Sequence, residues 1–211
     1  MLSVAIVDDH QIVRAGFRDM LEDELGVELA FEAGSGEAAL EMVCSKACNV
    51  MLLDLSLPGK SGVDTLREMR QRHPDVRVLV LSGFPEERYA LSMLRNGADG
   101  YLCKDCEREE LIKAIRTVAS GRRYVSPRTA QLLADEMTGA SHGAPHDTLS
   151  ERELQVFLRL AGGASVTDIA DGLHLSVKTI STYRTRLLEK LGVSSNAELA
   201  AYAIRHGLIV E

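Results

Sequence analysis

Five short apolar runs, each followed by helical periodicity, restrict the fold of this chain more than any other feature. They lie at residues 3–7, 27–33, 50–53, 76–81 and 100–103. The runs show little polar alternation, as expected for strands of a parallel sheet that is covered on both faces. Five strand–helix units within residues 1–120 predict an α/β domain with a doubly wound, five-stranded parallel sheet.

Polar side chains end four of these runs. Asp8 and Asp9 follow the first, Asp54 the third, Ser82 the fourth and Lys104 the fifth. Right-handed crossovers bring the carboxyl ends of parallel strands to one edge, where such sheets bind ligands. Three close carboxylates need a cation, and Mg²⁺ favours oxygen ligands. One carboxylate there can attack phosphorus, while Lys104 and Ser82 hold the phosphoryl oxygens.

Residues 1–120 resemble the receiver domain of two-component response regulators, which has a flavodoxin-like fold. The matching segments are Val7-Asp8-Asp9-His10, Leu53-Asp54-Leu55-Ser56-Leu57-Pro58-Gly59 with Gly62, Leu81-Ser82, and Tyr101-Leu102-Cys103-Lys104. One departure is Asp105, where many receivers carry proline.

The resemblance implies that Asp54 accepts a phosphoryl group from a sensor histidine kinase or a small phosphodonor. It implies that Asp9, Asp54 and the Ser56 carbonyl bind Mg²⁺, with Asp8 nearby. Ser82 and Tyr101 are then the hydroxyl and the aromatic residue of the switch, and Tyr101 is expected to move inward after phosphorylation.

Composition separates a second module from the first. The whole net charge of −7 falls on residues 1–147, whereas residues 148–211 carry seven basic and seven acidic residues. We expect residues 121–147 to be a linker, helical at first and then flexible, because its last part consists mostly of Gly, Ala, Ser, His and Pro.

Residues 148–211 show helix signals throughout. Ser150 and Glu153 form a capping-box pattern, and Ser176 and Gly192 bound a helix over 177–191. That helix carries four basic residues and one acidic residue, with an apolar stripe that includes Val177. Arg184 projects onto the stripe, so its guanidinium must either extend out to solvent or find a polar partner. A basic helix of this kind fits the DNA major groove, although a solvated amphipathic helix has the same pattern.

Residues 148–211 also resemble the LuxR-type helix-turn-helix. The matching segments are Leu149-Ser150-Glu151-Arg152-Glu153, Ile169-Ala170, Leu175-Ser176, Thr179-Ile180, Lys190-Leu191-Gly192-Val193 and Gly207-Leu208-Ile209. The resemblance implies that Ser181, Thr182 and Thr185 face the bases of double-stranded DNA. It implies phosphate contacts for Lys178, Arg184, Arg186 and Lys190, with Tyr183 on the same helix where many members carry His. The helix around 197–204 is either a dimer contact or part of the module's core.

Together these features predict a phosphorylation-controlled transcription regulator that binds operator DNA as a homodimer and is not an enzyme. Two alternatives remain. A phosphohydrolase would use Asp54 as its nucleophile, but Ser56 stands where a general acid would be needed. A regulator that binds DNA regardless of phosphorylation would need the acidic residues only for folding.

Other sequence features have simpler interpretations. Gly34-Ser35-Gly36-Glu37-Ala38-Ala39 matches a dinucleotide fingerprint, but nearby acidic residues would repel a pyrophosphate, so we expect the glycines to turn the chain. Cys44 and Cys48 are expected on one helical face, and Cys103 and Cys106 form Cys-Lys-Asp-Cys; all four suit free thiols better than a zinc or redox site. With no bilayer-length apolar run and no basic leader, we expect a cytoplasmic protein without a membrane partner.

Overall fold

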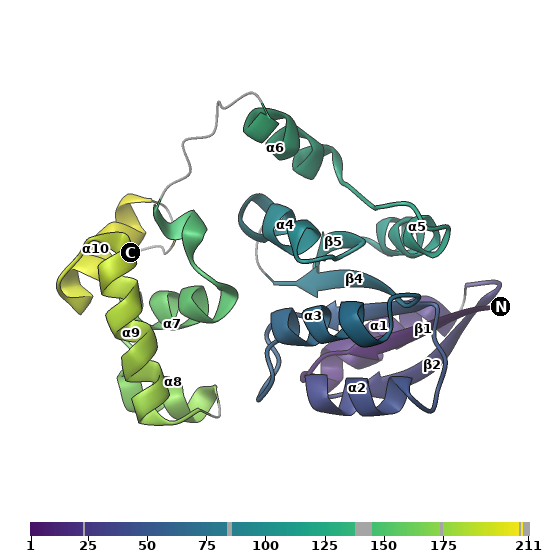
Figure 1. Cartoon of the computed structure of the whole chain (residues 1–211), viewed down its shortest axis with the longest axis horizontal. Helices are drawn as coiled ribbons and strands as arrows, with labels where there is room; N and C mark the ends of the chain where they lie inside the picture. The colour runs from purple at the N-terminus through teal and green to yellow at the C-terminus, as the bar shows by residue number, and fades with distance from the viewer. Residues whose placement is uncertain (23, 84–85, 138–144, 174, 207, 209–211) are drawn as a thin grey trace. The chain divides into compact units, whose positions relative to one another are not determined.

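The computed structural model describes residues 1–22, 24–83, 86–137, 145–173, 175–206 and 208 (Figure 1). The chain divides into two compact units, residues 1–141 and residues 142–211. The domain boundaries at residues 120 and 148 are sequence predictions that this division does not test. The helix that follows residue 126 belongs to the first unit.

The first unit alternates strands and helices as predicted. Its strands are β1 (Leu2–Val7), β2 (Val27–Ala33), β3 (Val50–Asp54), β4 (Arg77–Ser82) and β5 (Gly100–Cys103). Its helices are α1 (Gln11–Glu22), α2 (Gly36–Val43), α3 (Gly62–Arg72), α4 (Glu86–Arg95), α5 (Arg108–Ala119) and α6 (Pro127–Met137). The strands form one parallel sheet in the order β2-β1-β3-β4-β5, which confirms the predicted doubly wound fold.

The apolar runs of the sequence form the centre of this sheet. On one face, α1 and α5 bury Phe17, Leu21, Leu111 and Ile115 against Val4, Ile6, Leu52, Leu79 and Leu102 of the strands. The alternate strand residues, such as Met51, Leu53 and Val80, are also fully buried. Burial on both faces explains why the runs lack polar alternation.

The chain after α5 stays on the first unit. The backbone N–H of Tyr124 donates to the Asp99 carbonyl at 2.8 Å, and Tyr124 forms a parallel bridge with Gly100 at the start of β5. Ser126 then caps α6, since its Oγ accepts a hydrogen bond from the Thr129 N–H at 3.0 Å. The first part of the predicted linker is therefore ordered and packs on α4.

Where the structure describes it, the second unit is helical, as predicted. These residues form a short 3₁₀ turn, η1 (Pro145–Thr148), and the α-helices α7 (Glu151–Ala161), α8 (Val166–Gly172), α9 (Val177–Leu191) and α10 (Asn196–Arg205). The capping box of Ser150 and Glu153 is present, and Gly192 ends α9 in the left-handed conformation. A second capping box, formed by Ser165 and Asp168, begins α8.

Two details differ from the sequence predictions. Cys44 and Cys48 do not share a helical face, because α2 ends at Val43 and Cys44 already caps it. All four cysteines are free thiols. Val177 is 48% exposed instead of joining the buried stripe of α9, because it is the first residue of that helix. Within the described residues, we find no helix with both the length and the apolar character that a bilayer span requires.

Candidate functional site

The carboxyl ends of β1, β3, β4 and β5 bring four predicted side chains to one edge of the sheet. Asp8 follows β1, Asp54 and Ser82 end β3 and β4, and Lys104 follows β5. Asp8, Asp54 and Ser82 are each at most 2% exposed. The Nζ atom of Lys104 lies 2.6 Å from Asp8 Oδ2 and 2.8 Å from Asp54 Oδ2. One ammonium thus neutralises part of the charge of two buried carboxylates.

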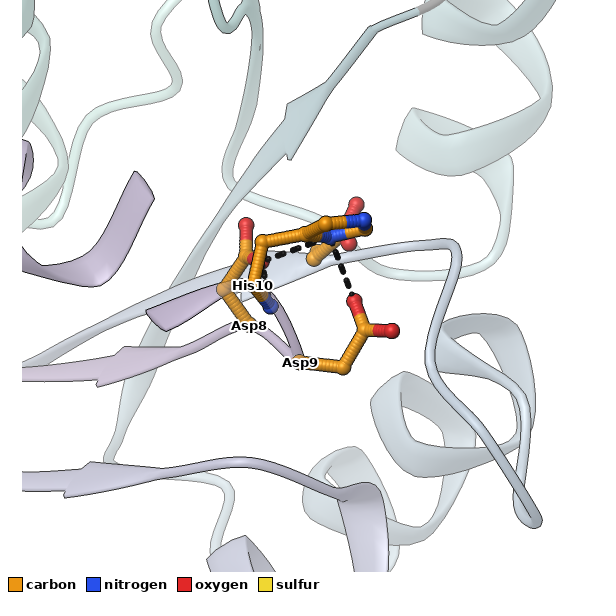
Figure 2. Close-up of side chains that lie close together, drawn as sticks. Asp8, Asp9 and His10 are labelled. Carbon is orange, nitrogen blue, oxygen red and sulfur yellow. Dashed lines mark hydrogen bonds and ion pairs between the residues drawn. The ribbon is translucent and has the colours of Figure 1, made fainter. Parts of the chain in front are cut away.

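Asp9 and His10 complete the acidic cluster on its more exposed side. His10 Nδ1 lies 2.7 Å from Asp9 Oδ1 and 3.4 Å from Asp8 Oδ1, as Figure 2 shows. Possible ligand atoms of Asp8, Asp9, His10 and Asp54 all lie within 4.8 Å of one another. His10 was not predicted as a site residue, although its position directly after the acidic pair was a usable signal.

Burial and charge oppose each other at Asp54. Burial raises the pKa of the Asp54 carboxyl, and so does the nearby Asp8, while the Lys104 ammonium lowers it. Burial alone would lower the pKa of Lys104, but its two carboxylate partners raise it overall. The ammonium therefore stays charged next to Asp54 at neutral pH.

The donor set suits a hard divalent cation. Asp54 Oδ1 is buried and has no hydrogen-bond partner among the described residues, which is costly for a carboxylate oxygen. Three carboxylates offer the oxygen ligands that Mg²⁺ favours. Ser56, whose carbonyl is the fourth predicted ligand, is half-buried in the loop directly after β3. The residues present therefore fit a Mg²⁺ ion.

The two predicted switch residues are both inside the unit. Ser82 is 0% exposed and Tyr101 is 2% exposed. Tyr101 lies on β5, which contacts α4. The expected inward movement of Tyr101 therefore does not apply to this conformation, because its ring is already buried.

The predicted DNA-facing residues form one exposed face of α9. This face consists of Lys178, Ser181, Thr182, Thr185 and Arg186, and Tyr183 beside it is half-buried. The three hydroxyls donate to backbone carbonyls one turn earlier, at 2.8–3.1 Å. Their oxygen lone pairs therefore remain available as acceptors on this face.

Two other predicted DNA-contacting residues are engaged within the second unit. Arg184 Nε donates to Asn196 Oδ1 at 2.7 Å, so of the two expected outcomes it is the polar partner that the structure shows. Lys190 Nζ lies 2.7 Å from Glu153 Oε2, the buried carboxylate of the capping box. Asn196 and Glu153 lie on other helices, so no local sequence pattern predicts either pairing.

Comparisons with known protein families identify the class. Residues 4–116 match the family described as response regulator receiver domain. Residues 147–203 match the family described as bacterial regulatory proteins, luxR family. The chain therefore belongs to the two-component response regulators of the NarL/FixJ type, which join a receiver domain to a LuxR-type DNA-binding domain.

Individual relatives match over nearly the whole length. The response regulator GacA of Pseudomonas syringae pv. syringae is 40% identical over 210 residues, which cover 99% of this chain and 98% of GacA. UvrY of Escherichia coli K12 is 39% identical over 209 residues, covering 99% and 96%. RcsB of Salmonella enterica serovar Typhimurium, solved bound to promoter rprA with the phosphomimetic BeF3−, has a TM-score of 0.66 and 27% identity over 96% of this chain and 98% of RcsB.

Proposed function

We propose that this response regulator accepts a phosphoryl group on Asp54 from a sensor histidine kinase and then binds operator DNA as a homodimer. The observation that carries the proposal is the contact of Lys104 Nζ with the carboxylates of both Asp8 and Asp54 at the sheet edge. This contact supports the proposal, because the buried Asp54 carboxylate, the proposed nucleophile, lies beside an ammonium that can bind phosphoryl oxygens.

Asp9, Asp54 and the Ser56 carbonyl would hold Mg²⁺, with Asp8 close by. When bound, the ion supplies positive charge that neutralises the phosphoryl oxygens during transfer. Asp54 contributes the attacking oxygen: a P–O bond to its carboxylate forms as the P–N bond of the donor phosphohistidine breaks. The histidine nitrogen retains that electron pair. The Lys104 ammonium then leaves the carboxylates for the new phosphoryl oxygens, and the Ser82 hydroxyl donates to another.

Glu86 offers a route from this site to α6. Glu86 begins α4, four residues after Ser82, and its Oε2 accepts hydrogen bonds from Ser126 Oγ and from Thr129 Oγ1, the latter at 2.9 Å. Ser126 and Thr129 are both nearly fully buried. We infer that a shift of Ser82 toward a phosphoryl group moves the start of α4. This movement would change the hydrogen bonds by which Glu86 attaches the start of α6 to α4.

Glu86→Ala should weaken the phosphorylation dependence of DNA binding. It removes the acceptor of two hydrogen bonds to a carboxylate, each worth about 1.5–3 kcal/mol at most. We expect the DNA affinity of the unphosphorylated protein to move toward that of the phosphorylated one, by up to about tenfold. Fluorescence anisotropy with and without acetyl phosphate measures the ratio. Glu109→Ala, an exposed acidic residue of α5, is the matched control, and an equal ratio for both variants contradicts the coupling.

The exposed face of α9 supports the proposed DNA contact. Ser181, Thr182 and Thr185 would face base edges, with Tyr183 at the margin. Lys178 and Arg186 would hold phosphates, and Arg184 and Lys190 would join them only by leaving Asn196 and Glu153. The helix α10 supports dimerisation, because Leu199 and Ala203 are in the core while Ala197, Ala201 and Ile204 are exposed.

Lys178→Ala should weaken binding to all DNA sequences alike and reduce the slope of log affinity against log salt by about 0.9, the value for one phosphate contact. Lys113→Ala, at an exposed lysine of α5 in the first unit, is the matched control. We expect Lys113→Ala to leave the salt slope unchanged. An unchanged slope for Lys178→Ala, or an equal reduction for Lys113→Ala, contradicts this assignment.

We place the protein in the cytoplasm, where its kinase donor and DNA are both accessible. The function is tested by measuring operator affinity, with fragments selected from genomic DNA, in Mg²⁺ with and without acetyl phosphate. We expect phosphodonor-dependent tightening of binding. Equal affinity in both conditions would instead favour DNA binding that is independent of phosphorylation, and sustained turnover of a generic phosphate ester would favour a phosphohydrolase.

A further inference from the structure

The Gly34–Ala39 segment, which has the pattern of a nucleotide fingerprint, packs against the loop that follows Asp54. Ser35 caps α2, since its Oγ accepts from the Ala38 N–H at 3.2 Å. Gly36 is buried, and a Cβ there would overlap Thr65 Oγ1 of α3 and lie 3.2 Å from the Lys60 carbonyl oxygen. Glycine is therefore needed because the first turn of α2 lies directly against the loop and the start of α3.

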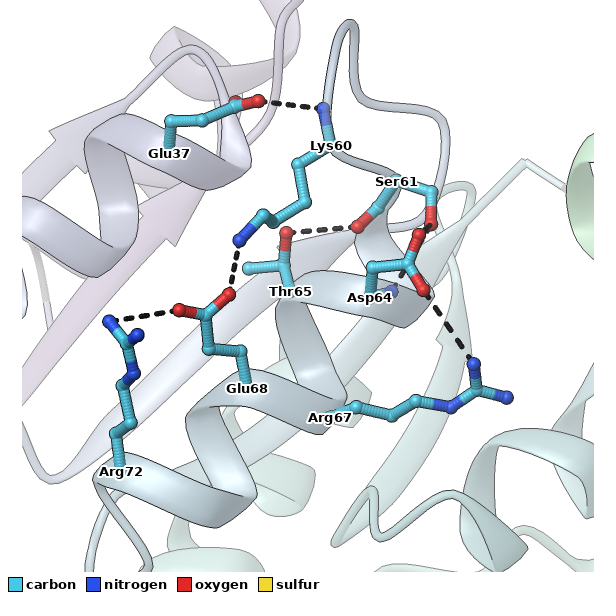
Figure 3. A network of polar contacts seen from close by, with 8 residues as sticks. All are labelled: Glu37, Lys60, Ser61, Asp64, Thr65, Arg67, Glu68 and Arg72. Atoms are coloured by element: carbon cyan, nitrogen blue, oxygen red, sulfur yellow. Dashed lines mark hydrogen bonds and ion pairs between the residues drawn. The ribbon is translucent and has the colours of Figure 1, made fainter.

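Glu37 contacts the same loop through its carboxylate. Its Oε1 accepts a hydrogen bond from the Lys60 backbone N–H at 2.8 Å, as Figure 3 shows. Gly59, the preceding residue, has φ +66°, and a Cβ there would lie 2.8 Å from Glu37 Oε1. Gly59 therefore both permits the turn and leaves room for the carboxylate.

The ammonium group of the Lys60 side chain is also held in place, by an ion pair with α3. Its ammonium pairs with Glu68 on α3, and Glu68 in turn accepts from Arg72 Nη1 at 2.9 Å (Figure 3). The loop closes with a hydrogen bond from the Gly62 N–H to the Leu55 carbonyl at 3.1 Å. Lys60 is thus held by its backbone to α2 and by its side chain to α3.

Glu37 stays ionised at neutral pH. Backbone hydrogen bonds from its own helix and from Lys60 hold the pKa of the Glu37 carboxyl below its ordinary value, although burial acts in the opposite direction. A carboxylate accepts a backbone N–H more strongly than a neutral oxygen does.

We propose that Glu37 is a positioning residue for phosphoryl acceptance: by holding the Lys60 amide, it fixes the loop from Leu55 to Lys60 that carries the Ser56 carbonyl. Glu37 touches neither Asp54 nor the donor. Without it, the loop gains conformations in which that carbonyl is displaced, so Mg²⁺ binding weakens while Asp54 remains intact. This inference rests on the proposed function, because it assigns the Ser56 carbonyl to the ion.

The test compares three variants of the full chain by isothermal titration with Mg²⁺ alone and by hydrogen exchange of the Lys60 amide. Glu37→Ala should raise the Kd for Mg²⁺ about threefold to tenfold, as expected for one lost charge-assisted hydrogen bond, and should speed exchange at Lys60. Glu37→Gln keeps an acceptor oxygen and should restore most of the affinity. Glu41→Ala removes the same charge from an exposed position of α2 and should match the wild type.

Phosphorylation by acetyl phosphate adds a second readout. The rate at which Glu37→Ala is phosphorylated should be below that of the wild type at low Mg²⁺ and should approach it at saturating Mg²⁺. The inference is overturned if Glu37→Ala binds Mg²⁺ like Glu41→Ala. If Glu37→Ala does not fold, the outcome depends on Gly59→Ala, because its added Cβ crowds the Glu37 carboxylate; wild-type Mg²⁺ affinity of Gly59→Ala then overturns the inference. A wild-type protein that never accepts a phosphoryl group refutes the proposed function itself.

Discussion

Asp54→Asn should abolish the response of DNA binding to a phosphodonor. The substitution removes the nucleophilic oxygen and leaves an amide of nearly the same shape in the same buried position. A nearly complete population switch requires about 5.5 kcal/mol of differential stabilisation, and in the proposed mechanism all of it depends on phosphorylation of Asp54. We therefore expect the ratio of operator affinities with and without acetyl phosphate to fall to about one, measured by fluorescence anisotropy.

Folding provides the control for this variant. Burial and the neighbouring Asp8 both disfavour the Asp54 carboxylate, so a neutral amide should cost little stability. We expect a melting temperature at or above that of the wild type and unchanged affinity for DNA without phosphodonor. A variant that still responds to acetyl phosphate would place the phosphoacceptor elsewhere.

Glu153→Ala should strongly lower the free energy of unfolding of the DNA-binding unit. Glu153 is 4% exposed, accepts the Ser150 N–H at 2.8 Å to complete the capping box, and pairs with Lys190 on α9. The lost cap costs about 1 kcal/mol. Removing one partner of a buried ion pair costs about 3–5 kcal/mol, reduced here because Lys190 is partly exposed. We expect a loss of about 2–4 kcal/mol, measured by urea denaturation, together with loss of DNA binding.

Two comparisons isolate the ion pair. Glu189→Ala on the exposed face of α9 removes the same charge and should change stability by less than about 0.5 kcal/mol. In a double-mutant cycle, Lys190→Met should cost less in the Glu153→Ala background than in the wild type. Additive effects of the two substitutions would show that the pair does not couple α7 to α9.

The Glu153–Lys190 ion pair makes the stability of the DNA-binding unit depend on pH in a direction that can be stated. Burial alone would raise the pKa of Glu153, but hydrogen bonds from Lys190 and Ser150 hold it below its ordinary value of 4.5. A depressed folded-state pKa adds stability above the unfolded-state value, and that stability is lost as the pH falls through the folded-state value. Below pH 4.5 the wild type should therefore lose stability faster than Glu153→Ala.

The edge of the sheet could be predicted from the sequence because it follows from topology. Once the apolar runs are assigned to parallel strands, Asp8, Asp54, Ser82 and Lys104 must meet at their carboxyl ends. The capping signals at Ser150 and Ser176 were equally local, since each depends on residues three positions apart.

Contacts between distant segments could not be predicted in the same way. The partners of Arg184 and Lys190 are Asn196 and Glu153, which the chain brings close only when the helices pack. The glycine at position 36 was expected to turn the chain, whereas the structure shows that it avoids a clash with Thr65. Such requirements depend on the distance between two helices, which no short sequence pattern encodes.

The most direct test of the account is to locate a phosphoryl group by peptide mass spectrometry after incubation with acetyl phosphate. We expect a Mg²⁺-dependent acyl phosphate, labile in both strong acid and base, on the peptide that contains Asp54, and its absence when the ion is chelated. An unmodified Asp54 under saturating Mg²⁺ and phosphodonor, or a stable modification at another residue, would contradict it.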